Sequence, residues 1–143
     1  MSRNLLMILG VVEIEDDVRA LGACPLEYNR TPDYKEILGN IFKGLQYIHK
    51  TKQPVLLVTS SGTGVMEGAV TNIMNSSSEA LFVNGGVFGE RWGEILKAHK
   101  IKTHEIKLNY GTPVTPEQIE DLLNNNPNIE AVFLTHNETS TGT

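Results

Sequence analysis

The chain has 143 residues, of which 40% are hydrophobic and 20% are charged, and its formal net charge at pH 7 is −5. This composition is typical of a folded globular domain and excludes the disordered and collagen-like classes. The longest apolar runs, residues 5–9 and 55–58, fall far short of the ~20 apolar residues of a membrane-spanning helix. Acidic residues follow the first run at once, which is unlike a secretory signal, so we expect a cytoplasmic protein that does not bind membranes. No Lys/Arg cluster occurs, so we expect no binding to nucleic acid.

The single cysteine, Cys24, cannot form a disulfide within the chain, and it excludes a structural zinc site built on several cysteines. Folding must therefore depend on a hydrophobic core. A chain of this length can build one, because a domain of about 150 residues buries roughly 68% of its unfolded surface.

The first part of the chain is predicted to be helical and extended. A short helix is expected near Asp16 to Leu21, and Thr31-Pro32 begins a long amphipathic helix that runs to about His49. We expect residues 1–53 to form this N-terminal segment and residues 54–143 to form the first part of an α/β domain.

From residue 54 onward, short β-rich runs alternate with segments of helical periodicity. The predicted helices are residues 63–74, residues 88–99 and a third that begins after Thr115. The predicted strands are Pro54 to Thr59, Ala80 to Asn84, Thr103 to Leu108 and Ala131 to Thr135. Strands joined by helices in this way run parallel, so the pattern predicts an α/β fold with a mostly parallel sheet and flanking helices.

The third of these helices has a clear start signal. Thr115 is placed to cap the helix, Pro116 occupies its first position, and Gln118 follows three residues after the cap. This spacing predicts a capping box, in which the Thr side chain accepts a hydrogen bond from the Gln backbone N–H and the Gln side chain accepts one from the Thr backbone N–H.

The segment Thr59-Ser60-Ser61-Gly62-Thr63-Gly64 joins a predicted strand to a predicted helix. A helix start offers unpaired N–H groups at the positive end of the helix dipole, and glycines let an anion come close to the backbone, so a phosphate fits here. The loop lacks the Gly-Lys-Ser/Thr of a Walker motif. An ordinary strand-to-helix turn capped by Ser or Thr explains the same residues equally well.

A second segment, Asn84-Gly85-Gly86-Val87-Phe88-Gly89, follows the next predicted strand. Ligands of open α/β sheets bind outside the carboxyl ends of the strands, so Phe88 could stack on a flat ligand. Taken alone, the segment favours the simpler interpretation, in which Phe88 anchors its helix to the sheet.

The polar segment from Thr135 to Gly142 follows the last predicted strand. His136 and Glu138 could serve as metal ligands, but no third ligand stands near them in the sequence. We therefore expect no metal and favour hydrogen bonding to a polar ligand.

These segments, in this order and spacing, resemble the class V family of pyridoxal-phosphate aminotransferases, in particular its serine–pyruvate and alanine–glyoxylate branch. The matching runs are SGTGVME at residues 61–67, NGGVFGERW at residues 84–92 and HNETSTG at residues 136–142. Residues 9–10 and 30–32 also resemble family positions. The resemblance implies the large domain of a fold-type-I transferase, truncated after its first part.

The resemblance also implies roles for individual residues. It assigns the phosphate of pyridoxal 5'-phosphate to Ser61, Gly62 and Thr63. Phe88 would stack on the pyridine ring, Thr139 would hydrogen-bond on the side of its phenolic oxygen, and Gly10 would border the substrate carboxylate. The chain departs from the family around Gly10, where prolines are usual, and at Asn29, where His is usual.

Family members are more than twice as long as this chain, and their cofactor-binding lysine lies beyond the matched part. The last lysine here, Lys107, precedes the last predicted strand. The resemblance therefore implies a parent enzyme that transfers an amino group from a small amino acid to a 2-oxo acid such as glyoxylate or pyruvate. It assigns no catalytic residue to this chain, which we expect to be inactive alone and to pair as a homodimer or with a C-terminal half.

Two other classes of protein stay open on the residues themselves. One is a flavodoxin-like electron carrier that binds FMN. The phosphate loop of a flavodoxin follows its first strand near the N-terminus, whereas the candidate loop of this chain begins only at residue 59. The other is a non-catalytic fragment that assembles with another chain. The absorbance of a bound chromophore separates all three hypotheses.

Overall fold

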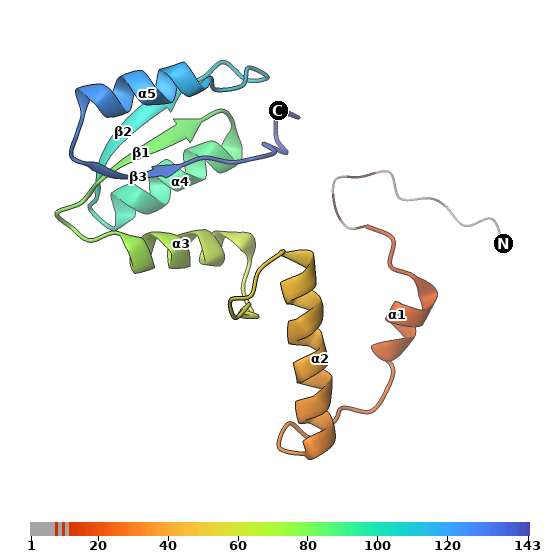
Figure 1. Cartoon of the computed structure of the whole chain (residues 1–143). Coiled ribbons are helices and arrows are strands. Elements are labelled where there is room, and N and C mark those ends of the chain that lie inside the picture. The colour runs from red at the N-terminus through yellow and green to blue at the C-terminus, as the bar shows by residue number, and fades with distance from the viewer. Residues whose placement is uncertain (1–7, 9, 11) are drawn as a thin grey trace. The chain divides into compact units, whose positions relative to one another are not determined.

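The computed structural model describes residues 8, 10 and 12–143, and the chain forms two units, Met1–Leu57 and Val58–Thr143 (Figure 1). The first unit contains α1 (Asp16–Leu21) and α2 (Pro32–Ile48). Thr31 begins α2 as predicted, since its Oγ1 accepts a hydrogen bond from the Tyr34 N–H at 3.2 Å. No residue of either helix is buried.

The second unit contains a sheet of three parallel strands, β1 (Glu79–Asn84), β2 (Lys102–Lys107) and β3 (Ile129–Phe133), in the order β2-β1-β3. Strand β1 is central, and five of its six residues are buried. Its apolar run Ala80 to Val83 is what a strand covered on both faces requires. The predicted α/β fold with a parallel sheet is confirmed.

Three helices accompany the sheet: α3 (Gly62–Ile73), α4 (Val87–Ala98) and α5 (Pro116–Asn125). In Figure 1, α3 and α4 lie on one side of the sheet and α5 lies on the other. Helix α4 packs on β1 and β2, and α3 packs against α4. No helix within the described ranges is long and apolar enough to cross a membrane.

The core lies between the sheet and the α3–α4 layer. Its buried residues are Val70, Met74, Ala80, Phe82, Ile95, Leu96, Ile101 and Phe133. Helix α4 comes very close to β1, because a Cβ atom at Gly89 would lie 2.6 Å from the Val83 carbonyl oxygen and one at Gly93 would lie 2.5 Å from the Phe82 ring. The first turn of α4 is thereby held at the carboxyl end of β1.

The strand predicted for Pro54 to Thr59 is wrong. Residues 54–58 have no regular secondary structure, and Leu56 and Leu57 are 79% and 61% exposed. A strand exists through its hydrogen bonds to a neighbour, and no other described segment pairs with this one. An apolar, β-prone run was therefore not sufficient to form a strand here.

The capping box of α5 is confirmed. The Thr115 N–H donates to Gln118 Oε1 at 2.9 Å, and the Gln118 N–H donates to Thr115 Oγ1 at 3.4 Å. This start signal could be recognised from sequence because all of its contacts are local.

Candidate functional site

The first candidate segment, Ser61-Gly62-Thr63, forms the start of α3. Ser61 precedes the helix without capping it through its side chain, and its carbonyl oxygen accepts bonds from the Gly64 and Val65 N–H groups at 3.0 and 3.4 Å. In the part of the chain that the structure describes, the N–H groups of Gly62 and Thr63 donate no hydrogen bond. Gly62 is exposed and Thr63 is half-buried, so two free donors lie at the positive end of a 12-residue helix.

Arg91 of α4 reaches this helix start. Its Nη1 donates a hydrogen bond to Thr63 Oγ1 at 2.9 Å, and its Nε lies 3.4 Å from Glu94 Oε2. The guanidinium thus brings a positive charge next to the first turn of α3. The sequence interpretation did not single out Arg91, because only the packing of α3 on α4 places it beside Thr63.

A surface hollow of about 330 Å³ joins the second and third candidate segments. Its lining residues are Met66, Phe88, Trp92, Leu134, Thr135, Asn137 and Thr139. We call it the Phe88 hollow. Phe88 is 41% exposed and lies outside the buried core, so it does not act as a simple core anchor.

The three candidate segments meet around this hollow to different degrees. Phe88 and Thr139 both line it, whereas Ser61, Gly62 and Thr63 do not. The start of α3 is linked to the hollow through Met66, which lines it and lies one turn after Thr63. Phe88 and Thr139 follow β1 and β3 respectively, so the hollow lies beyond the carboxyl ends of parallel strands.

Glu138 belongs to the third segment and is only 4% exposed. Its carboxylate accepts hydrogen bonds from the Gly89 N–H at 2.9 Å, the Phe88 N–H at 3.4 Å and the Ser140 hydroxyl at 2.6 Å. Burial acts to raise the pKa of Glu138, but the hydrogen bonds from Ser140, Gly89 and Phe88 outweigh it and hold the pKa below its ordinary value. The buried carboxylate is therefore ionised near neutral pH.

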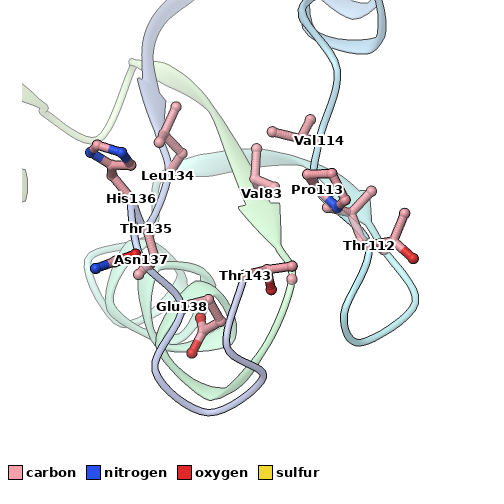
Figure 2. Close-up of a pocket in the computed structure, with 12 residues that line it drawn as sticks. Val83, Thr112, Pro113, Val114, Leu134, Thr135, His136, Asn137, Glu138 and Thr143 are labelled. Carbon is pink, nitrogen blue, oxygen red and sulfur yellow. The ribbon is translucent and has the colours of Figure 1, made fainter.

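The Glu138 carboxylate makes its contacts with the start of α4 and with Ser140. Its carboxylate is directed to the start of α4, and Figure 2 shows the His136 ring and the Glu138 carboxylate well apart. Within the described ranges, no group of three or more His, Cys, Asp or Glu residues could hold a metal ion. Glu138 lines a second cavity, of about 200 Å³, together with Val83, Pro113 and Leu134. Figure 2 draws these residues.

Gly10, the residue expected to border a substrate carboxylate, belongs to the first unit. It lies in an exposed bend, and a Cβ atom at this position would meet nothing within 4 Å. Its neighbours Leu9 and Val11 lie outside the described residues. The role of Gly10 stays a prediction.

Comparisons with known proteins identify relatives along nearly the whole chain. An uncharacterized aminotransferase of Helicobacter pylori is 39% identical over 138 residues, which are 96% of this chain and 37% of that protein. The serine–glyoxylate aminotransferase of Hyphomicrobium methylovorum is 34% identical over 140 residues, which are 96% of this chain and 35% of that protein. No family model matches the chain.

A solved structure shows the same fold. The pyridoxamine–pyruvate aminotransferase of Mesorhizobium loti superposes with a TM-score of 0.88 at 20% sequence identity, over 95% of this chain and 35% of that one. The chain therefore spans little more than a third of the length of the proteins it matches. Together with the parallel sheet and its flanking helices, these matches show that the chain is homologous to part of the class V, fold-type-I aminotransferases.

Proposed function

We propose that the chain is the part of a pyridoxal-phosphate-dependent aminotransferase that holds the cofactor's phosphate and ring. The parent enzyme would transfer an amino group from a small amino acid to a 2-oxo acid such as glyoxylate or pyruvate. The observation that carries the proposal is the Phe88 hollow, which brings Phe88 and Thr139 together and has a wall on α3 one turn after Thr63.

The start of α3 fits a phosphate group. Gly62 and Thr63 offer two backbone donors without partners in the described chain. Thr63 Oγ1 already accepts a bond from Arg91, so its own O–H proton is available to a phosphate oxygen. The Arg91 guanidinium adds a positive charge that favours a dianion at this place.

The Phe88 hollow fits a flat aromatic ring. The exposed part of Phe88 offers a face on which a ring can stack, and the Thr139 hydroxyl makes no hydrogen bond in the part of the chain described. When bound, pyridoxal phosphate supplies an electron sink for amino-group transfer. The residues of this chain bind and orient it, and none of the described residues that line the hollow is a lysine.

The remaining functions of the parent enzyme are assigned to residues outside this chain. The chain spans about 37% of its relatives, and the resemblance requires a lysine that follows the matched part. We propose that a homodimer, or a complex with a C-terminal half, supplies that lysine and the residues that select the amino donor and the acceptor.

A titration of the chain with pyridoxal phosphate tests this proposal. Trp92 is the single tryptophan and lines the Phe88 hollow, so its fluorescence reports on a ring that enters the hollow. We expect saturable quenching by pyridoxal phosphate, weaker binding of pyridoxal without its phosphate, and competition by inorganic phosphate.

FMN is the control ligand, because it carries both a phosphate and a flat ring. Tighter binding of FMN than of pyridoxal phosphate would overturn the proposal in favour of a flavin carrier. Absence of saturable quenching by either ligand would overturn it in favour of a non-binding fragment.

A further inference from the structure

The second unit has two helix starts that follow glycine-containing segments, and they differ in how their N–H groups are used. At α3, the N–H groups of Gly62 and Thr63 have no partner in the described chain. At α4, the first three N–H groups, those of Val87, Phe88 and Gly89, are all bonded by side chains from the segment after β3. Of these two helix starts, only that of α3 has N–H groups without a partner among the described residues.

The α4 start is bonded by Glu138 and Ser140 together. Ser140 Oγ accepts from the Val87 N–H at 3.0 Å and donates to Glu138 Oε1 at 2.6 Å. Glu138 accepts from the Phe88 and Gly89 N–H groups, and Oε1 also accepts from the Ser140 N–H at 3.3 Å. The carboxylate thus fills the place that a bound anion would take at a helix N-terminus.

The preceding residue, Gly86, leaves room for this arrangement. A Cβ atom at Gly86 would lie 2.6 Å from Glu138 Cγ and 2.5 Å from Ser140 Oγ. Gly86 offers no side chain to cap α4, so the cap comes from a segment about fifty residues later in the chain. The position of the Glu138 side chain therefore depends on the absence of a side chain at Gly86.

A buried carboxylate needs compensation for its lost hydration. No Lys, Arg or His forms an ion pair or hydrogen bond with Glu138 in the described chain. The compensation comes instead from the N–H groups, the Ser140 hydroxyl and the positive end of the α4 dipole. The backbone N–H groups of Phe88 and Gly89 belong to the first turn of a helix, so their hydrogen bonds hold the Glu138 carboxylate in one position.

We propose that Glu138 is a positioning residue whose carboxylate serves as the built-in anion of α4 and fixes Phe88 and Thr139 relative to each other. Phe88 is held through its own N–H, and Thr139 lies between Glu138 and Ser140 in the chain. The same carboxylate closes the α4 start to phosphate, which leaves α3 as the phosphate site. This inference rests on the proposed function, because it concerns the geometry of the same hollow.

The test compares Glu138→Gln with Glu79→Gln. Glu79 is a matched control, since its side chain is 14% exposed and accepts bonds from His104 and Lys102, but it lies at the amino end of β1. With Trp92 fluorescence as the readout, Glu138→Gln should weaken pyridoxal phosphate binding roughly 10-fold or more, because it removes the charge-assisted bonds that hold Phe88 and Gly89 at the start of α4. Glu79→Gln should leave the affinity unchanged.

Chemical rescue separates positioning by a carboxylate from a general structural role. In Glu138→Ala, added formate should bind at the vacated α4 start and restore much of the affinity for pyridoxal phosphate. Formate should not restore Glu138→Gln, whose amide still fills the space. If Glu138→Ala does not fold, Ser140→Ala is the milder variant, and a loss of affinity smaller than that of Glu138→Gln is expected.

Amide hydrogen exchange gives a readout that needs no cofactor. Exchange at Val87, Phe88 and Gly89 should be faster in Glu138→Gln than in the unmodified chain, and unchanged in Glu79→Gln. If the unmodified chain binds pyridoxal phosphate and Glu138→Gln binds it equally well, the positioning role is overturned and the proposed function stands. If the unmodified chain does not bind, the proposed function fails, and exchange at Val87, Phe88 and Gly89 alone decides whether Glu138 fixes the start of α4; equal exchange in Glu138→Gln and the unmodified chain overturns that role as well.

Discussion

Arg91 Nη1 donates a hydrogen bond to Thr63 Oγ1 at 2.9 Å and so joins α4 to the first turn of α3. An arginine can only donate, so Thr63 is the acceptor and keeps its own proton for another partner. The Arg91 Nε is buried without a hydrogen bond, although it lies 3.4 Å from Glu94 Oε2. The guanidinium is thus held in place by packing as well as by its contact with Thr63.

Removal of the Thr63 hydroxyl should weaken phosphate binding. A hydrogen bond to a charged group contributes about 1.5–3 kcal/mol, so Thr63→Val should lower the affinity for pyridoxal phosphate roughly 10- to 100-fold. Thr63→Ser keeps the hydroxyl and should stay close to the unmodified chain. Isothermal titration measures both, and equal affinities for Val and Ser at this position would contradict a role of the hydroxyl.

Substitution of two helical glycines by alanine should change stability in opposite directions, because Gly93 lies close to β1 and Gly68 has open space around it. A Cβ atom at Gly93 would lie 2.5 Å from the ring of Phe82, which is 2% exposed and belongs to the buried core. Gly93→Ala should therefore lower the free energy of unfolding by about 1–3 kcal/mol.

Gly68, in the middle of α3, is the matched position. A Cβ atom there meets nothing within 4 Å, so Gly68→Ala should raise the free energy of unfolding by roughly 0.5–1 kcal/mol through helix propensity alone. Urea denaturation of both variants checks the pair. Stabilisation by Gly93→Ala would show that the helix and strand are not held together this closely.

The pH dependence of stability should carry a contribution from Glu138. Burial acts to raise its pKa, but the hydrogen bonds from Ser140, Gly89 and Phe88 lower it below the ordinary value of 4.5. The folded state therefore binds this proton more weakly than the unfolded state does. The stabilisation is fully present above the ordinary pKa and is lost as the pH falls through the lowered one.

Glu138→Gln should accordingly flatten the acidic side of the stability curve. Urea denaturation from neutral pH down to about pH 3 measures the free energy of unfolding across this window. Some slope should remain in the variant, because the hydrogen bond from His104 also lowers the pKa of Glu79. Identical curves for the variant and the unmodified chain would contradict the contribution of Glu138.

The parts of the structure that could be predicted from sequence are those that depend on local patterns. The Thr31 and Thr115 helix starts need contacts only within one turn, and the central strand shows as an apolar run at Ala80 to Val83. The prediction of a strand at Pro54 to Thr59 was wrong because a strand needs a neighbouring strand to bond with. The apolar run alone does not show whether such a neighbour is present.

The candidate site shows the same division. The glycine-rich and polar segments follow predicted parallel strands, so the rule for ligand sites in such sheets predicted that they meet, and the resemblance singled out Thr139. Phe88 and Thr139 do line one hollow, and their roles toward a cofactor stay predictions. Arg91 was missed, and Glu138 was read only as a weak metal ligand. Both act on partners about 28 to 50 residues away, and these contacts arise from helix packing that one sequence does not display.

The chain should associate with a second polypeptide. Strands β2 and β3 each have one unpaired edge among the described residues, and Leu56, Leu57 and Val58 are all more than half exposed. Open edges and exposed apolar side chains of this kind favour association. Sedimentation velocity over a range of concentrations should show species larger than the 15.8 kDa chain, and a single 15.8 kDa species at every concentration would contradict this expectation.

The chain alone should bind pyridoxal phosphate without turning over amino acids. No lysine is among the described residues that line the Phe88 hollow, and Lys107, the last lysine of the chain, lies at the end of β2 outside that lining. An aminotransferase needs a lysine amine beside the cofactor carbonyl, because that amine forms the covalent link and moves the proton. Borohydride reduction of the complex, followed by intact-mass analysis, should therefore show no stoichiometric covalent adduct, and an assay with serine or alanine and glyoxylate should show no product. A single adduct on one lysine, together with turnover, would mean that this chain supplies the reactive amine itself. That result would contradict the proposal that this chain only binds and orients the cofactor.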